Sequence, residues 1–260
     1  NTVTKIARVK SFKFPEAGFG YMAYQLDKLD TAKKAAAAAP KKDSEIDFAD
    51  DEPAAGQKKE EGTDLIVKNL LTNVDKTYKY VTDYAFSKDG KQLVFACSGS
   101  KKDKSAPQGV FLLNTEKGTL KTLVKGKGSF KSFTFDEESE HLAFVGEQSP
   151  EKQEIKDFNI YYNSLTLDTA QTIVDYDMPG LPAKWSVSGD GRVSFSKDGK
   201  KLFFGIAPIK KAKDTTIVDF EVAKVDVWNY KDDYLQPMQL KNADRDSKKS
   251  FLSVIDVYSN

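Results

Sequence analysis

Short apolar runs recur along this chain, and each run is bounded by turn residues such as Gly, Asp and Ser. One run reads QLVFA at 92–96, and another reads KLFFG at 201–205. A third places Phe158, Ile160 and Tyr162 at alternate positions, which is the period of a half-buried strand. Short runs rich in Val, Phe, Ile and Tyr predict β-strands joined by hairpins.

The hexapeptide FSKDGK occurs twice, at Phe86–Lys91 and at Phe195–Lys200. In each copy the Phe ends one strand, Ser-Lys-Asp-Gly forms the turn, and the apolar run returns as the next strand. Gly accepts a positive φ without steric cost, and Asp can bond its own downstream backbone. The predicted turn residues are Asp89, Gly90, Asp198 and Gly199. A duplicated Asp-Gly ligand site is the alternative, and the hairpin is favoured because Asp-Gly is a common hairpin turn.

Two weaker copies of this unit extend the pattern. Phe135 leads the copy FTFDEESEHLAF, and Phe14 leads the degenerate copy FKFPEAGFGYMAYQL. The lead aromatics of the last three copies are roughly 50 to 60 residues apart, slightly more than the usual propeller repeat of about 40 to 50. The residues expected to hold the fold are Phe86, Phe95, Phe135, Phe144, Phe195, Phe204 and Trp228.

A second pair of predicted strands follows each hairpin. The pairs lie at 109–114 with 119–124, at 158–162 with 171–176, and within 216–241. Four antiparallel strands per repeat are typical of a β-propeller. We therefore predict an all-β chain that forms a partial propeller of about four blades.

Composition supports a folded core and argues against two kinds of partner. Hydrophobic residues make up 39% of the chain and aromatic residues 12%, which suits large side chains between sheets. No apolar run reaches the roughly 18 residues of a membrane-spanning helix. Lys and Arg number 40 against 39 Asp and Glu, so the net charge does not indicate a nucleic-acid-binding surface.

The segment 28–62 differs from the rest, because it is rich in Ala, Lys, Asp and Glu and nearly free of core residues. We interpret it as a low-complexity insertion in the first unit of a single domain over 1–260, solvated or with one short helix. A mobile flap or partner-binding tail is the alternative. The chain begins at Asn1 without Met, and its last apolar run stops abruptly, so we expect a fragment of a longer protein.

Sequence motifs for catalysis and metal binding are missing. The string KWSVSGDG at Lys184–Gly191 comes nearest to a nucleophile elbow, but it lacks the Gly two places before either serine. His141 is predicted to be an edge or surface residue rather than a catalytic base, since no Ser or Cys motif accompanies it. Cys97 is predicted to be a small buried residue. With one His and one Cys, a zinc site is disfavoured.

Two acidic strings, at 47–52 and 242–247, lack the spacing of a calcium loop and are interpreted as solvated loops. Several aromatic residues could line a carbohydrate or peptide pocket, although packing between blades is favoured for them. These residues are Tyr161, Tyr162, Trp185, Trp228 and Tyr230. We assign no catalytic, cofactor-binding or metal-binding residue to this chain, and no cofactor.

Three strings together resemble a known family. They are VKSFKFPEAGFGYMAYQL at 9–26, VSFSKDGKKLFFG at 193–205 and VDVWNYKDDYLQPMQL at 225–240. They resemble the propeller region of secreted prolyl-oligopeptidase-like (S9-type) serine peptidases of Bacteroides-like bacteria. The resemblance covers nearly the whole chain outside 28–62. The run at 225–240 is its more specific part, because many TolB-like and dipeptidyl-peptidase propellers share the Ser-Lys-Asp-Gly turns.

The resemblance implies a propeller that gates and positions peptide substrates for a C-terminal α/β-hydrolase domain on the same polypeptide, in the periplasm or outside the cell. That domain, with its Ser, Asp and His, lies outside this sequence, so no catalytic residue is carried over. Such propellers usually have about seven or eight blades, and this chain shows about four. The alternative is a non-enzymatic TolB- or WD40-like binding scaffold. Closure by a second copy, or a glycosidase with a carboxylate pair in the central funnel, is less favoured.

Overall fold

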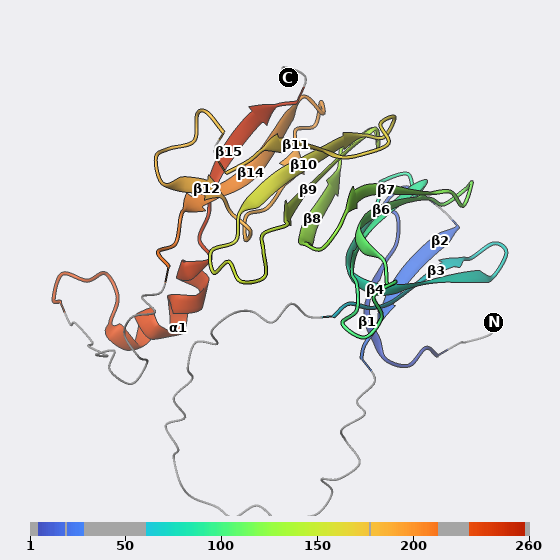
Figure 1. Ribbon diagram of the computed structural model, residues 1–260, viewed down its shortest axis with the longest axis horizontal. Helices are drawn as coiled ribbons and strands as arrows, with labels where there is room; N and C mark the ends of the chain where they lie inside the picture. Colours follow the sequence, from blue (N-terminus) through green and yellow to red (C-terminus); the bar gives the residue numbers. More distant parts are fainter. Residues whose placement is uncertain (1–4, 19, 29–60, 177, 213–228, 258–260) are drawn as a thin grey trace, which may run out of the picture.

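The computed structural model describes residues 5–18, 20–28, 61–176, 178–212 and 229–257 of the chain. These residues form strands β1–β15 and one helix, α1 (Figure 1). All strand pairs are antiparallel, and the strands make two sheets. The prediction of an all-β chain is confirmed, and the pairing within the sheets resolves four propeller blades.

The first sheet contains blades 1 and 2. Its strands are β1 (Val9–Lys13), β2 (Tyr21–Leu26), β3 (Thr63–Asn69), β4 (Val74–Phe86), β5 (Gln92–Ser98), β6 (Gln108–Asn114) and β7 (Leu120–Lys125), paired in that order. The long strand β4 belongs to both blades, since its first half pairs with β3 and its second half pairs with β5. Tyr80, with φ of 61°, lies between the two halves. Blade 1 is therefore β1–β2–β3–β4, and blade 2 is β4–β5–β6–β7.

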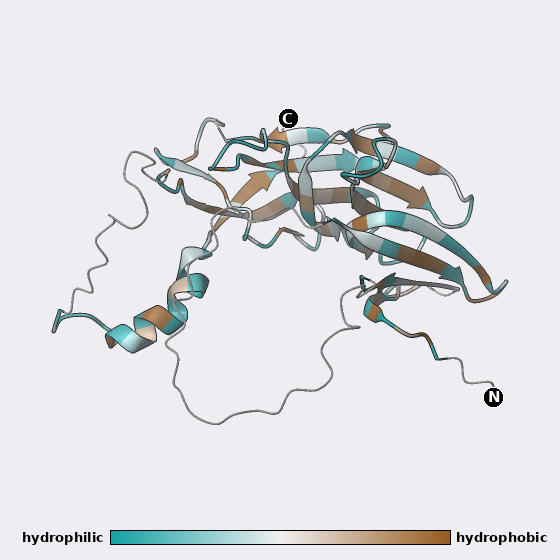
Figure 2. Ribbon diagram, turned by 60° about the horizontal axis from the view of Figure 1, so that its bottom comes forward, coloured by the Kyte–Doolittle hydropathy of each residue, from teal (hydrophilic) through white to brown (hydrophobic). Residues whose placement is uncertain are grey.

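The second sheet contains blades 3 and 4. Blade 3 is β8 (Ser129–Phe135), β9 (His141–Glu147), β10 (Phe158–Ser164) and β11 (Gln171–Val174). In blade 4, β14 (Lys201–Pro208) pairs on one side with β12 (Trp185–Val187) and β13 (Ser194–Phe195), and on the other with β15 (Phe251–Asp256). Helix α1 (Gln236–Ser247) lies in the connection between β14 and β15 and stands apart from the sheets (Figure 2).

Three apolar clusters hold the blades together face to face. The cluster between blades 1 and 2 includes Leu65, Val67, Leu93 and Phe95. The cluster between blades 2 and 3 includes Val94, Leu112, Leu142 and Phe144. The cluster between blades 3 and 4 includes Ala143, Ile160, Leu202 and Phe204. Successive residues of β5 and β9 thus face opposite seams, which explains why these strands are buried along nearly their whole length. Each buried Leu or Phe contributes about 1.5 to 3 kcal/mol of hydrophobic stabilisation.

The predicted core residues fall into two groups. Phe95, Phe144 and Phe204 are 1%, 0% and 3% exposed and are confirmed as core residues. The lead aromatics Phe86, Phe135 and Phe195 are half-buried at the margins of the clusters. Trp228 lies outside the described residues.

The repeated hairpins form as predicted and share one set of hydrogen bonds. In blade 2 the side chain of Ser87 accepts a hydrogen bond from the backbone N–H of Gln92 at 2.9 Å, and Ser196 makes the same bond in blade 4, also at 2.9 Å. In blade 3, Asp136 Oδ1 takes this part and accepts from the N–H of His141 at 2.8 Å. The repeat therefore encodes the same turn three times with two different side chains.

A second shared bond identifies β15 as the third strand of blade 4. In three blades the residue after the third strand donates its backbone N–H to the carbonyl of the residue before the second strand. The pairs are Thr115 to Lys91, Leu165 to Glu140 and Val257 to Lys200, each at 2.9 Å. The third strand of blade 4 was predicted within 216–241, so its predicted position along the chain is wrong.

Most of the predicted insertion at 28–62 lies outside the described residues, as do 213–228 of the last unit. Gln236–Ser247 is a helix rather than a strand, and it includes the acidic string 242–247 that was predicted to be a loop. Pro lies in its first turn, and Gln, Met, Leu, Lys, Ala and Arg are good helix formers. In the described part of the chain, no helix has the length and apolarity to span a bilayer.

Candidate functional site

The hairpin turns of all four blades lie at the same end of the first strands. Strand β8 contacts both β4 and β13, so these first strands run next to one another. The turn of blade 2 packs on that of blade 1, where Ala17 donates its N–H to the carbonyl of Lys88 at 2.8 Å. In blade 4, Gly199 lies against the side chain of Asp136 in the turn of blade 3. We call this end of the molecule the turn face.

The turn face carries an alternating set of charges. The second residue after the lead aromatic is acidic in blade 1, basic in blade 2, acidic in blade 3 and basic in blade 4. These four residues, which we call the turn ring, are Glu16, Lys88, Glu137 and Lys197. The sequence alone contains this signal, but it becomes visible only when all four hairpins are aligned on their lead aromatics.

Neighbouring members of the turn ring interact. Lys88 forms an ion pair with Glu137 across the seam between blades 2 and 3. The hydrogen bond to Glu137, together with the nearby charge of Glu16, raises the pKa of the Lys88 ammonium group. The same hydrogen bond lowers the pKa of the Glu137 carboxyl, and the positive charge of Lys197 lowers it further.

An open hollow of about 430 Å³ lies on the turn face where blades 1, 2 and 3 meet. It is lined by lead aromatics, backbone and side chains of the turns, and charges of both signs. The lining residues are Lys13, Phe14, Glu16, Ala85, Phe86, Ser87, Lys88, Phe133, Thr134, Phe135, Asp136 and Glu137. Phe14 is 52% exposed, and Asp136 is 5% exposed. The hollow combines aromatic surface with polar groups that are held in place by the hairpins.

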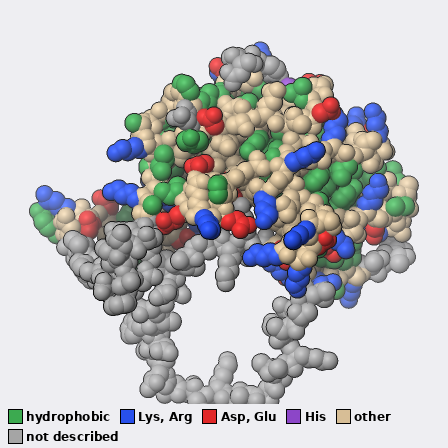
Figure 3. Space-filling view, viewed as in Figure 1, with side chains coloured by type: hydrophobic (Ala, Val, Ile, Leu, Met, Phe, Trp, Pro, Cys, Tyr) green, Lys and Arg blue, Asp and Glu red, His purple; other side chains and the backbone are tan. Residues whose placement is uncertain are grey.

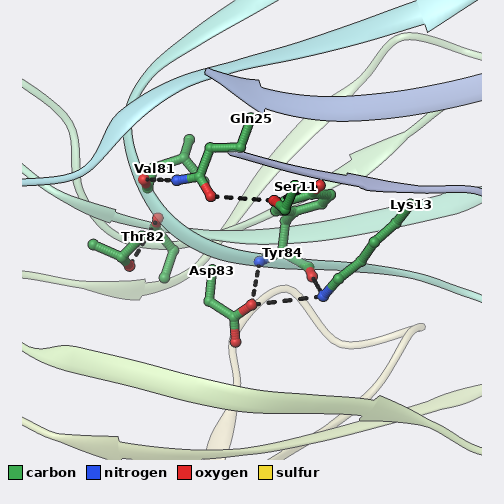
Figure 4. A network of polar contacts seen from close by, with 8 residues as sticks. Ser11, Lys13, Gln25, Val81, Thr82, Asp83 and Tyr84 are labelled. Atoms are coloured by element: carbon green, nitrogen blue, oxygen red, sulfur yellow. Dashed lines mark hydrogen bonds and ion pairs between the residues drawn. The ribbon is translucent and has the colours of Figure 1, made fainter. Parts of the chain in front are cut away.

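A polar network joins β1 to β4, and its member Lys13 also lines the hollow (Figure 4). Lys13 Nζ lies 3.7 Å from Asp83 Oδ1 and donates to the carbonyl of Tyr84 at 2.5 Å. The hydroxyl groups of Ser11 and Tyr84 are 3.1 Å apart. Burial raises the pKa of the Tyr84 phenol, and the adjacent Asp83 carboxylate raises it further, against the lowering effect of the bond to Ser11.

The same network supports an irregularity in β4. The register between β4 and β5 shifts between Val81 and Asp83. Gln25, which is 4% exposed, donates to the carbonyl of Val81 at 2.7 Å. The register also shifts in β1 and in β8, so the first strands of three blades bulge, and the bulge in β8 includes Thr134 of the hollow's lining. Bulges re-aim side chains and are common next to functional sites.

A further ion pair crosses the next seam, where Lys131 Nζ of β8 lies 3.6 Å from Oδ1 of Asp190, a residue of the turn between β12 and β13. On the side of the molecule shown in Figure 3, basic and acidic side chains lie interspersed among apolar ones. Side chains of both signs are therefore present on this side.

His141 is not the edge or surface residue that was predicted. It begins β9, which pairs with β8 and β10 on its two sides, and it is 9% exposed. Its Nδ1 lies 2.7 Å from the hydroxyl of Tyr162, and the two rings stack. Strand pairing on both sides, which cannot be read from the string SEHLAF, explains the difference.

Cys97 is buried in β5, as predicted, and is 3% exposed. Burial raises the pKa of its thiol to about 12. A thiol with so high a pKa is almost wholly protonated at neutral pH, so it is a poor nucleophile and a poor metal ligand. In the described part of the chain, groups of three or more metal-binding side chains do not occur.

Of the five aromatic residues considered as a pocket, Trp228 lies outside the described residues, and the other four do not line a common pocket. Tyr161 and Tyr162 are buried on opposite faces of β10, and Tyr161 stacks on Phe144 with ring centroids 5.2 Å apart. Trp185 contacts Phe251 in blade 4, and Tyr230 is 91% exposed. The packing interpretation is therefore confirmed for the two buried tyrosines. The aromatics that do line a hollow are lead residues of the repeat.

The chain matches no protein-family model and no curated protein. Among solved structures it is similar to the tricorn protease, with 12% identity over 83% of this chain and 17% of that one, and a TM-score of 0.47. An acylaminoacyl peptidase of Pyrococcus horikoshii gives 12% identity, 75% and 27% coverage, and a TM-score of 0.40. TolB from Acinetobacter baumannii gives 13% identity, 78% and 39% coverage, and a TM-score of 0.39. The chain thus spans 17% to 39% of the length of these proteins.

Proposed function

We propose that this chain is a non-catalytic propeller that binds peptides on its turn face and positions them for a serine peptidase domain of the same parent polypeptide. The observation that carries the proposal is the open hollow where blades 1, 2 and 3 meet. The resemblance of the sequence strings to S9-type propellers is the reason to name peptides as the ligands and a serine peptidase as the attached domain. The location that goes with this proposal is the periplasm or the cell exterior.

The composition of the hollow suits a peptide. Phe14, Phe86 and Phe135 offer aromatic surface to apolar side chains, while Lys13 and Glu16 offer opposite charges within the same lining. Binding groups on turns work best when a rigid scaffold holds the turns. Here the side chains of Ser87 and Asp136 fix two of these turns by hydrogen bonds to the backbone.

The role of the chain would be to bind and orient peptides and to restrict entry to them. Acyl transfer would take place on the Ser, His and Asp of the hydrolase domain. Holding a substrate in a productive geometry accelerates a reaction without chemistry by the groups that hold it. We expect long peptides to use the hollow and very short ones to bypass it.

Phe14→Ala tests the proposal, with Leu120→Ala as the matched control. Both residues are exposed, at 52% and 49%, but Leu120 lies on the outer strand β7, away from the hollow. Truncation of a central aromatic at an interface typically weakens binding about five- to ten-fold. In the parent protein, Phe14→Ala should lower kcat/KM for long peptides by this factor and leave a one-residue chromogenic substrate unchanged. Equal effects of Phe14→Ala and Leu120→Ala on long peptides would reject the site.

A protein-interaction scaffold is the second candidate, and helix α1 favours it. The helix contains no buried residue, and Leu235, Met238 and Leu240 are 73%, 48% and 62% exposed. Exposed apolar residues gathered on one element often mark a partner surface. This reading predicts that the parent gene encodes no G-x-S-x-G elbow after the codon for Asn260, whereas the peptidase proposal requires one followed by Asp and His.

A further inference from the structure

The lining of the hollow holds more negative charge than positive charge. Its basic residues are Lys13 and Lys88, and its acidic residues are Glu16, Asp136 and Glu137. Each lysine already has an acidic partner, because Lys13 lies 3.7 Å from Asp83 and Lys88 pairs with Glu137. Among the described residues, neither Glu16 nor Asp136 takes part in an ion pair. The hollow is therefore better suited to a cation than to an anion.

Asp136 brings a half-satisfied carboxylate to this lining. Its side chain is 5% exposed, and its Oδ1 accepts hydrogen bonds from the backbone N–H groups of Glu140 and His141, both at 2.8 Å. Its Oδ2 accepts no hydrogen bond from the described residues and is not among their enclosed unpaired atoms, so it reaches the open space of the hollow. A carboxylate that is largely withdrawn from water is stabilised by a partner for each oxygen, and Oδ2 lacks one.

The hairpin of blade 3 does not need the charge of Asp136. In blades 2 and 4 the residues at the same place are Ser87 and Ser196, and each accepts the corresponding backbone N–H with a neutral hydroxyl at 2.9 Å. A neutral acceptor is thus sufficient for this turn, so the second oxygen and the negative charge of Asp136 serve no purpose in the hairpin itself. Their position in the lining points to a ligand that carries a positive charge and hydrogen-bond donors.

The aromatic part of the lining narrows the choice of cation. Phe14 is 52% exposed, and Phe86 and Phe135 are half-buried. The guanidinium group of arginine is planar, stacks on aromatic rings and carries five N–H donors in a fixed fork that suits carboxylates. The ammonium group of lysine is compact and strongly hydrated, so it gains less from aromatic surface. Carboxylates next to aromatic rings therefore favour arginine.

We propose that the hollow is a specificity site for an arginine side chain of the bound peptide. The guanidinium group donates to Oδ2 of Asp136 and lies against the aromatic lining, and Glu16 in the turn of blade 1 adds negative charge to the same site. Charge-assisted hydrogen bonds of this kind are stronger than neutral ones. This inference rests on the proposed peptide-binding function and names its substrate class, which is peptides with an internal arginine.

Isothermal titration calorimetry of the 260-residue chain with two matched peptides provides the test. Both are nine-residue peptides with apolar neighbours around the central position, and both are blocked at the two ends. One has arginine at the centre, and the other has citrulline, which is nearly the same size and planar but uncharged. Because the ends are blocked, the arginine is the only cation. We expect the arginine peptide to bind about ten-fold more tightly than the citrulline peptide.

Two variants locate the site. Asp136→Asn keeps an oxygen that can accept from the N–H groups of the turn and removes the charge, so it should weaken binding of the arginine peptide about ten-fold and leave the citrulline peptide unchanged. Glu16→Gln should weaken binding of the arginine peptide about two- to five-fold, because Glu16 is exposed. Glu138→Gln is the control and should change neither affinity, since Glu138 is an exposed carboxylate of the same turn outside the lining.

Thermal unfolding shows whether Asp136→Asn folds, and if it does not, the citrulline comparison and Glu16→Gln still decide, because both leave the turn of blade 3 untouched. Equal affinities for the two peptides, both weakened by Phe14→Ala, overturn the arginine site and keep the peptide-binding function. Failure of both peptides to bind, or binding that Phe14→Ala leaves unchanged, overturns the proposed function as well. A preference for arginine that survives both Asp136→Asn and Glu16→Gln overturns the site, because the cation then binds elsewhere.

Discussion

Ser139 occupies in the hairpin of blade 3 the place that Gly199 occupies in that of blade 4, and both have a left-handed backbone, with φ of 60° and 69°. Gly90 takes the same place in blade 2 with φ of 76°. A left-handed conformation costs a residue with a Cβ about 1 to 2 kcal/mol, and Gly almost nothing. The hydroxyl of Ser139 is also buried without a hydrogen-bond partner. The third hairpin therefore keeps the geometry of the repeat with a residue poorly suited to it.

Ser139→Gly should raise the free energy of unfolding by about 1 kcal/mol, because it removes the strain and the unpaired hydroxyl. The greater chain entropy of Gly in the unfolded state offsets part of this gain. Urea denaturation followed by tryptophan fluorescence measures the change. Ser129→Gly is the control and should destabilise, because Ser129 lies in strand β8 and its backbone is not left-handed. A Ser139→Gly protein less stable than the parent would show that the hydroxyl makes a bond in solution.

Gly90→Ala should destabilise more than Gly199→Ala. Both positions have positive φ, so both variants suffer the same backbone strain. A Cβ on Gly90 would lie 2.7 Å from the side chain of Pro15 in the neighbouring turn, whereas a Cβ on Gly199 would meet Asp136 at 3.5 Å, an ordinary contact. We expect Gly199→Ala to lower the free energy of unfolding by about 1 to 2 kcal/mol, and Gly90→Ala to lower it by about 1 kcal/mol more.

Thermal unfolding of the two variants, compared under identical conditions, is sufficient for this test. Equal losses of stability would mean that the turn of blade 1 moves away from Gly90 at little cost. In that case the contact between the first two turns would not contribute to the rigidity of the hollow.

The hairpins could be predicted from the sequence because their cause is local. Ser, Asp and Gly in FSKDGK dictate a turn wherever they occur, and the apolar run that follows can only return as a strand. The same is true of Phe95, Phe144 and Cys97, whose burial follows from their central place in apolar strands. Four blades with three seams are the consequence of repeating this unit.

What the sequence did not reveal depends on partners distant along the chain. The exposure of Phe14 and the partial exposure of Phe86 follow from how three blades meet, and no local pattern contains that information. His141 is buried because β8 and β10 flank its strand. The helix at 236–247 was missed because the aromatic run before it resembles a strand. The predicted strand region was therefore extended to 241, into residues that form the helix. The turn ring could have been found by aligning the four lead aromatics.

Gln25→Met should lower the free energy of unfolding by about 1 to 3 kcal/mol, because it leaves the carbonyl of Val81 without its donor in a buried position. Met is similar in size, so packing changes little. Gln92→Met is the control, since Gln92 is half-buried and takes part in the hairpin through its backbone. Chemical denaturation of both variants makes the comparison, and equal small losses would mean that water replaces the amide of Gln25.

The stability of the protein should fall as the pH rises above about 9, and Cys97 should account for part of the fall. Burial raises the pKa of its thiol from 9.0 to about 12, so the unfolded chain loses this proton at a lower pH than the folded one. The folded state is therefore favoured fully below pH 9, and this advantage is lost progressively between about pH 9 and 12. Tyr78 and Tyr84, whose pKa values burial also raises, act in the same direction.

Cys97→Ala separates the thiol from the tyrosines, because it keeps their contribution and removes only that of Cys97. We expect the free energy of unfolding of this variant to decline less steeply with pH than that of the parent chain, measured by urea denaturation from about pH 8 to pH 10.5. The difference between the two proteins should consequently shrink as the pH rises. A difference that stays constant over this range would mean that the folded thiol ionises as readily as the unfolded one, and hence that water reaches β5 from the seam between blades 1 and 2.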